Sequence, residues 1–282
     1  WWLLSDDRGD RAPPRAYPAH WHVTAQGFGP IRIDEPVALP LFDGEVPDPE
    51  ALRFSPCLNH WVWASEGLLA RGQPPAVRAL RWPEPSTAAD PGPVRARPLG
   101  GLALPRWLQG PDPARPDGAS GPRANRNIEG LAFTPRSDAL WVALEAPLLQ
   151  DGPEPDPQRG ALLRFAKVPL AGGPASAQAY EIGPIRRMGE GGRRRADIGV
   201  SEILTLAGGQ LLVIERNGYE VADGQFAFAI ALFVADPDRP QEGGGWLLMA
   251  VFRAASNTSD LVVFDAEAIA DGPVAVVHLP DR

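Results

Sequence analysis

One segment of this chain recurs 79 residues further on without any gap (129 − 50 = 79). The first copy covers residues 48–66 and the second covers 127–145, and Glu, Leu, Phe, Pro, Ala and Glu recur in register. Self-similarity at a fixed period is typical of folds that place copies of one supersecondary unit side by side. This repeat therefore restricts the chain to an architecture built from such units.

Each copy has the pattern of a β-hairpin. A strand with alternating apolar residues begins at Glu50 or Glu129, and a Ser/Thr-Pro turn follows it. The second strand is rich in aromatic and β-branched residues and ends at Glu66 or Glu145. A shorter third copy covers residues 201–216, and residues 1–7 form half a copy, an apolar strand that ends in carboxylates.

Further strand-like runs between the copies provide two more strands for each hairpin, for example at 20–25, 31–39, 76–82, 161–168, 178–182 and 226–234. The 30 Gly and 33 Pro among 282 residues fit short strands that are joined by turns. We therefore predict an all-β fold, a β-propeller of about five to six four-stranded blades. Residues 1–282 form one domain in this prediction, with an incomplete first blade at the N-terminus and a divergent last blade at 236–282. We expect the C-terminal strands to meet Trp1–Leu4 and close the ring.

Repeat symmetry also predicts an acidic site. Equivalent residues of successive blades reach the same position along the propeller axis, so we expect Glu50, Glu129 and Glu202 to surround one mouth of the central channel. We predict that these three glutamates are the catalytic residues. Clustered carboxylates raise one another's pKa unless a cation neutralises them, and Ca²⁺ prefers six to eight such oxygen ligands. The predicted Ca²⁺ ligands are Asp6, Glu50, Glu129, Glu145, Glu202 and Glu215.

Three further residues are candidates for substrate binding. Arg216 follows an apolar strand, Arg194 lies in the arginine-rich loop 185–195, and Asn127 offers an amide beside Glu129. Guanidinium groups suit phosphate because their N–H donors form paired hydrogen bonds. The alternatives are ordinary ones: a solvated loop, a surface ion pair at Glu215–Arg216, and glutamates that only accept backbone N–H bonds at strand ends.

Composition and missing motifs exclude several classes of protein. The net charge of −8 and the lack of a basic stripe argue against a nucleic-acid partner. No apolar run is long enough to span a membrane, and the single cysteine, Cys57, excludes an internal disulfide. No hydrolase Gly-x-Ser-x-Gly elbow, zinc-protease motif or phosphate-binding loop occurs. No signal peptide is evident at Trp1, so we expect a processed chain.

An ordered set of short motifs resembles the phytase-like family, whose domain is described by an esterase-like activity of phytase. The motifs are Leu4-Ser5-Asp6-Asp7-Arg8-Gly9, Asp48-Pro49-Glu50-Ala51, Ser65-Glu66-Gly67, Asn127-Ile128-Glu129-Gly130, Leu144-Glu145-Ala146-Pro147, Gly199-Val200-Ser201-Glu202 and Val213-Ile214-Glu215-Arg216. The resemblance covers residues 1 to about 235. It implies a β-propeller, usually exported from bacteria to the periplasm or beyond, that hydrolyses a small-molecule ester or phosphoester.

The last 45 or so residues are instead similar to the last blades of carotenoid oxygenases, propellers that hold iron with four histidines. The four histidines here do not have that spacing, so we interpret this match as a shared blade pattern or a mosaic and not as a sign of iron chemistry. Three functions remain at this point: a metal-assisted (phospho)ester hydrolase, a propeller that only binds a ligand or a protein, and, least favoured, a carotenoid-oxygenase relative. The oligomeric state is not indicated by the sequence.

Overall fold

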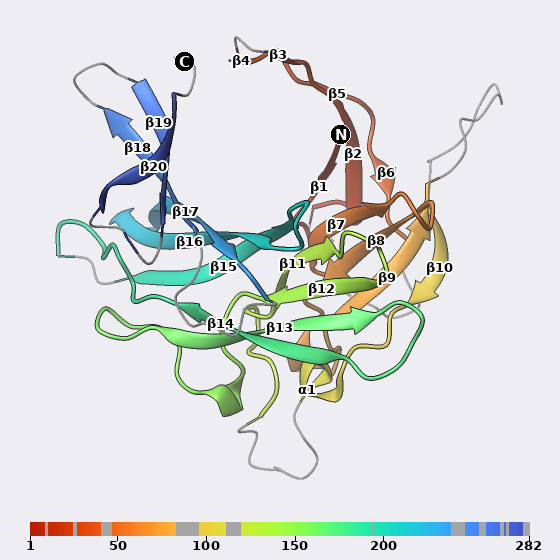
Figure 1. Ribbon diagram of the computed structural model, residues 1–282. Coiled ribbons are helices and arrows are strands. Elements are labelled where there is room, and N and C mark those ends of the chain that lie inside the picture. The colour runs from red at the N-terminus through yellow and green to blue at the C-terminus, as the bar shows by residue number, and fades with distance from the viewer. Residues whose placement is uncertain are drawn as a thin grey trace.

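The chain folds into antiparallel β-sheets that fan around a common centre (Figure 1). The structure is a computed structural model that describes residues 1–8, 11–24, 27–40, 47–82, 96–110, 120–192, 195–237, 246–253, 258–265, 268 and 271–278. Within these residues one short α-helix, α1 (Arg106–Gln109), and two 3-10 turns accompany the strands. The predicted all-β propeller fold is confirmed, with four blade-like sheets among the described residues.

The first sheet is small and consists of short strands. Its strands are β1 (Trp2–Leu4), β2 (Arg15–His20), β5 (Arg32–Ile33) and β6 (Val37–Ala38), and β2 pairs with each of the other three. A separate two-stranded ribbon joins β3 (Val23–Thr24) to β4 (Gly27–Phe28). The apolar runs at 20–25 and 31–39 predicted longer strands than the structure has. Strand β3 covers only part of the first run, and β5 and β6 are two short strands within the second.

The second and third sheets are complete four-stranded meanders that contain the two copies of the repeat. The second sheet holds β7 (Pro49–Ser55), β8 (His60–Ser65), β9 (Ala76–Arg81) and β10 (Arg97–Gly101) in that spatial order. The third holds β11 (Ile128–Phe133), β12 (Ala139–Leu144), β13 (Ala161–Pro169) and β14 (Ser176–Ile182). Both predicted hairpins, β7–β8 and β11–β12, are present with the expected turns.

The fourth sheet has six strands rather than four. They are β15 (Ala196–Thr205), β16 (Leu211–Ala222), β17 (Gln225–Ala235), β18 (Trp246–Arg253), β19 (Thr258–Asp265) and β20 (Pro273–His278). The expectation that the C-terminal strands meet Trp1–Leu4 is wrong for the described residues. The free edge of β17 at Leu232–Val234 pairs with β18 instead, so β18, β19 and β20 continue the fourth sheet. They lie at the opposite end of the arc from the first sheet (Figure 1).

The innermost strands of neighbouring sheets lie side by side. Strand β7 contacts β1 and β11, and β11 contacts β15. Apolar side chains fill the space between successive sheets, with Trp63 between the first and second, Leu131 between the second and third, and Phe165 between the third and fourth. Burying one such large side chain contributes about 1.5–3 kcal/mol, so the sheets are fixed relative to one another. This packing positions the ends of the inner strands, where the carboxylates lie.

Candidate active site

Six carboxylates lie at one end of the inner hairpins, and we call them the carboxylate cluster. Five of them lie before or at the start of the first strand of a hairpin or directly after its second strand, and Asp6 follows β1. The members are Asp6, Asp48, Glu50, Glu66, Glu129 and Glu145. They form two groups, Asp6–Asp48–Glu50 and Glu66–Glu129–Glu145, and within each group one oxygen of every carboxylate lies within 4.8 Å of the others.

β-Bulges place Glu50 and Glu129 at the cluster. In the β7–β8 ladder, Pro49 pairs with Ser65 and Ala51 with Ala64, so Glu50 has no partner. Glu129 is bypassed in the same way between β11 and β12. A bulged residue is left outside the ladder and its side chain is redirected. The same device in two neighbouring hairpins therefore turns two glutamates toward one place.

The third hairpin has the same bulge but different residues. Val200 pairs with Glu215 and Glu202 with Ile214, so the bypassed residue is Ser201. Ser201 is thus the register equivalent of Glu50 and Glu129, and Glu202 lies one position further along β15. The shift continues on the second strand, where Arg216 takes the position of Glu66 and Glu145.

Glu66 and Glu145 accept backbone hydrogen bonds from the next sheet along the chain. The backbone N–H of Asn127 donates to Glu66 Oε1 at 2.6 Å, which joins the second sheet to the third. The N–H of Val200 donates to the backbone oxygen of Glu145 at 3.2 Å, which joins the third sheet to the fourth. Glu145 also fits against Gly199, where a Cβ would approach its Cγ to 2.6 Å. The cluster is therefore also a seam between sheets.

Burial and mutual repulsion raise the pKa of these carboxyl groups. Burial, followed by the charge of Glu129, raises the pKa of Glu50 to about 10. Burial, followed by Glu145 and Glu66, raises the pKa of Glu129 to about 9. Burial also raises the pKa of Glu66 to about 7, although the Asn127 N–H bond opposes the shift. At neutral pH and without a cation, Glu50 and Glu129 therefore hold protons.

Three arginines compensate part of the negative charge. Arg8 lies 2.7 Å from Asp48, and Arg216 lies 2.9 Å from Glu145. Arg126 lies 3.6 Å from Glu145 and 2.8 Å from Glu154. The pKa of Glu145 is nonetheless raised, because burial outweighs both arginines.

The structure places the remaining predicted residues as follows. Glu202 pairs with Arg53, and Glu215 lies on the opposite face of β16 from Arg216, where it accepts a hydrogen bond from Tyr180 at 2.7 Å and pairs with Arg186. Neither joins the carboxylate cluster. The Asn127 side chain binds backbone groups: its Oδ1 accepts from the N–H of Ile128 and its Nδ2 donates to the oxygens of Glu66 and Arg123. Arg194 lies outside the described residues.

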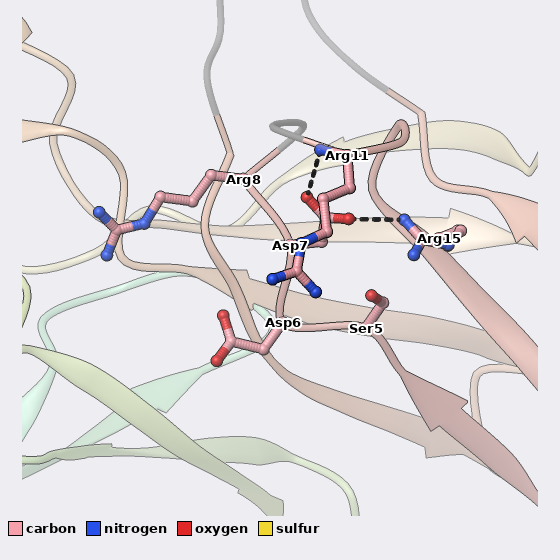
Figure 2. A pocket seen from close by; sticks show the side chains of 6 residues that line it. All are labelled: Ser5, Asp6, Asp7, Arg8, Arg11 and Arg15. Carbon is pink, nitrogen blue, oxygen red and sulfur yellow. Dashed lines mark hydrogen bonds and ion pairs between the residues drawn. The ribbon is translucent and has the colours of Figure 1, made fainter. Parts of the chain in front are cut away.

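A pocket of about 380 Å³ adjoins the cluster at the end of β1 (Figure 2). Asp6 belongs to both, and Arg8 extends from the pocket wall to Asp48. The lining residues are Ser5, Asp6, Asp7, Arg8, Arg11 and Arg15. Sequence reasoning missed the three arginines as a group. The available signal was their spacing directly after the Ser5–Asp6 motif, which matches Ser65–Glu66 of the second sheet.

The arginines of this pocket differ in their partners. Arg15 donates from Nη1 to Asp7 at 3.0 Å and from Nε to the Tyr17 hydroxyl at 2.6 Å. Arg8 is held by Asp48. The exposed side chain of Arg11 projects over the pocket (Figure 2), and its guanidinium makes no hydrogen bond to another described residue. Arg11 is therefore available to an anion that enters the pocket.

The donor set of the cluster fits a hard divalent cation. All six side chains offer carboxylate oxygens, the ligands that Ca²⁺ prefers. Burial, and after it the neighbouring carboxylates, raises the pKa of Glu50 and Glu129, so repulsion between carboxylates contributes to both shifts. A cation would remove this repulsion and favour the ionised carboxylates.

The histidines do not converge as an iron site requires. His20 lies on β2 beside Asp34 at 2.8 Å, His60 is on β8, and His278 is on β20 beside Asp260 at 2.7 Å. These strands belong to three different sheets, and His22 follows β2.

Comparison with known families agrees with the motifs and the fold. The family model described as "Phytase-like: Esterase-like activity of phytase" matches residues 1–271. The chain belongs to the phytase-like family. Membership supports a hydrolase-like function for this propeller, and phytase-like propellers bind metal ions, as the carboxylate cluster would allow. Phytase-like proteins are often extracellular, and no helix in the described part of the chain is long and apolar enough to cross a membrane.

Similarity to individual proteins is local or distant. Isoeugenol monooxygenase from Pseudomonas putida is 52% identical over 46 residues, which is 16% of this chain and 9% of that protein's length. A mannose phosphorylase from Leishmania mexicana, solved with a phosphate ion, has a TM-score of 0.29 at 13% identity, covering 86% of each chain. An apocarotenoid oxygenase from Synechocystis has a TM-score of 0.26 at 12% identity, covering all of this chain and 70% of that one.

Proposed function

We propose that this phytase-like protein is an exported, metal-assisted hydrolase of small phosphoesters. The observation that carries the proposal is the arginine-lined pocket that shares Asp6 with the carboxylate cluster. An anion-binding wall next to a cation site is the arrangement that phosphoryl transfer needs, because both the phosphate and its leaving group are charged.

The cluster and the pocket have separate roles in this proposal. Asp6, Asp48, Glu50, Glu66, Glu129 and Glu145 would hold the Ca²⁺. Bound there, the ion would act as a Lewis acid that polarises the phosphoryl oxygen and lowers the pKa of water. Arg11 and Arg8 bind and orient the phosphate, while the Asp7–Arg15 pair fixes the pocket wall. Arg216 holds Glu145 at the far side of the cluster.

Glu129 is the proposed general acid. It is half-buried and protonated at neutral pH only in the absence of a cation, because burial and neighbouring carboxylates raise its pKa. With Ca²⁺ bound its carboxylate would be ionised, so it would first accept the proton of the attacking water and then, as a general acid, pass that proton to the leaving oxygen. Glu66 is less suited to this role because its carboxylate is bound to the Asn127 N–H and almost fully buried. Glu50 lies in the other group, beside the pocket, where it shares the cation.

The test replaces Glu129 with Gln and measures hydrolysis of phosphomonoesters, phosphodiesters and carboxylesters with calcium present. We expect Glu129→Gln to lose about 100-fold or more in kcat, the contribution of a positioned general acid–base group. Stability in chelator should hold or rise, because Gln is neutral without the proton that Glu129 must take up on folding at neutral pH. Glu181→Gln is the matched control, since Glu181 is an exposed glutamate on β14.

Two results would contradict the proposal. Wild-type turnover in Glu129→Gln would remove Glu129 from the catalytic step. A wild-type protein that hydrolyses none of the three ester classes would favour a binding propeller, in which the pocket recognises an anionic ligand without cleaving it.

A further inference from the structure

Glu202 connects three inner strands directly beside the carboxylate cluster. Its Oε1 accepts the N–H of Ile203 on β15 at 2.8 Å, and its carboxylate also accepts the N–H of Leu131 on β11. Its other oxygen pairs with Arg53 of β7. The three bulged residues lie on these same strands. Glu50 is three residues before Arg53, Glu129 is two residues before Leu131, and Ser201 directly precedes Glu202.

Arg53 reaches past one strand to make this connection. Strands β7 and β15 are not neighbours, because β11 lies between them. One Nη of Arg53 donates to the backbone oxygen of Ile203 at 3.2 Å, and the other donates to its own neighbour Leu52 at 2.7 Å. These contacts fix the orientation of the Arg53 guanidinium as well as its charge. A planar guanidinium allows this, whereas the ammonium group of a lysine would not.

The close approach of β11 and β15 makes the contact possible. A Cβ on Gly130 would lie 2.9 Å from the N of Ile203 and 3.0 Å from its Cγ1. Gly130 directly follows Glu129, so the position of Glu129 depends on how closely the two strands approach. The side chains of Arg53 and Glu202 are only 23% and 29% exposed, so solvent screens their attraction less than on an open surface.

We propose that Arg53 and Glu202 are positioning residues that hold β7, β11 and β15 together against the repulsion within the carboxylate cluster. The proposal rests on the proposed cation site and adds to it a pair of residues that touch neither cation nor substrate. Without the pair, β7 moves relative to β15, and the carboxylates of Glu50 and Glu129 no longer converge.

The experiment measures calcium affinity and strand separation in Arg53→Met, Arg53→Lys and Glu202→Gln. By titration calorimetry we expect Arg53→Met to weaken Ca²⁺ binding by about tenfold, the low end for residues that orient metal ligands from outside. Arg53→Lys, which keeps the charge, should lose less. The control Arg136→Met removes a pair with Asp138 from the surface, where Arg136 is 88% exposed, and should bind Ca²⁺ as the wild type does.

Strand separation is measured by double electron–electron resonance between spin labels attached to Cys57 and to the cysteine of Ala207→Cys. These exposed residues lie in the turns that follow β7 and β15, so their distance reports the relation of the two strands. In chelator, Arg53→Met should broaden the distance distribution relative to wild type, and calcium should narrow it again.

Unchanged calcium affinity and an unchanged label distance in Arg53→Met would overturn the proposal, even if the variant unfolds at a lower temperature. If Arg53→Met does not fold, Arg53→Lys and Glu202→Gln decide by the same two measurements. If wild-type protein binds no Ca²⁺, the proposed cation site fails, and the label distance alone decides whether the pair positions the strands.

Discussion

Two glycines determine how closely the glutamates approach their neighbours. Gly199 at the start of β15 leaves the space that the Glu145 side chain occupies, and Gly130 lets β11 approach Ile203. Neither has the positive φ that favours glycine, so the requirement is for space rather than for backbone freedom. The seam between the third and fourth sheets therefore depends on the absence of a Cβ at these positions.

Gly199→Ala should consequently disturb Glu145. The new Cβ would lie 2.6 Å from Glu145 Cγ and 3.0 Å from its backbone oxygen, a contact that only a shift of the strand can relieve. We expect a loss of about 1–3 kcal/mol in the free energy of unfolding, as for other overpacked sites. Urea denaturation measures it. Gly183→Ala is the control, because its Cβ would meet only Arg186 Nη2 at 3.9 Å; equal stability of the two variants would contradict the steric account.

At the scale of the element, the β-hairpin is the unit that the sequence predicts well. Periodicity located both copies of the hairpin, and the outer strands β13 and β17, because apolar alternation reflects burial of one face. It did not reveal the bulges. The shorter third copy was matched by residue type, which set Glu202 against Glu50, whereas the ladder matches Ser201 to Glu50. A bulge depends on backbone pairing between two strands, which one strand's pattern does not encode.

Contacts between elements account for the other differences. Glu215 and Arg216 alternate across β16, and only the packing of Tyr180 and Arg186 against one face shows that Glu215 is used there. Arg216 then turns toward Glu145. Likewise, the pocket arginines come from a loop and from strand β2, so their convergence depends on how β1 and β2 pair.

The register of the bulge can be tested by restoring the missing carboxylate. Ser201→Glu places a glutamate at the position equivalent to Glu50 and Glu129. We expect stronger Ca²⁺ binding, because a ligand is added, and lower stability in chelator, because like charges repel. Calorimetry and thermal melting measure the two effects. The control is Leu204→Glu, which adds the same charge at an exposed position of the same strand, away from the cluster. It should change Ca²⁺ affinity and stability in chelator less than Ser201→Glu does.

At the scale of the whole molecule, the cluster joins sheets that are distant in sequence. Asp6 comes from the first sheet, Asp48, Glu50 and Glu66 from the second, and Glu129 and Glu145 from the third. Because the cluster joins three sheets, its balance of charge affects the free energy of global unfolding. The stability of the metal-free protein should therefore depend on pH in a direction that the raised pKa values determine.

Stability in chelator should fall as the pH rises from 7 to 9. In the folded protein the pKa of Glu129 is about 9 and that of Glu50 about 10, whereas both carboxyls have ordinary values of 4.5 when unfolded. Across this window the folded chain holds protons that the unfolded chain has released, and each such group lowers stability by at most about 1.4 kcal/mol per pH unit. The pKa values of His60, Asp138 and Asp156 are lowered in the folded protein, so these groups change stability only below about pH 6.5, outside the window from pH 7 to 9.

Calcium and one substitution separate this effect from general alkaline instability. The proposed Ca²⁺ would favour the ionised carboxylates and would bind only the folded cluster, so a millimolar concentration should raise the melting temperature more at pH 9 than at pH 7. Glu50→Gln removes one of the two groups and should flatten the decline in chelator, whereas Glu181→Gln should leave it unchanged. A melting temperature that is constant or rises between pH 7 and 9 in chelator would mean that Glu50 and Glu129 are ionised in the folded protein without a cation, and that the arginines around the cluster already neutralise it.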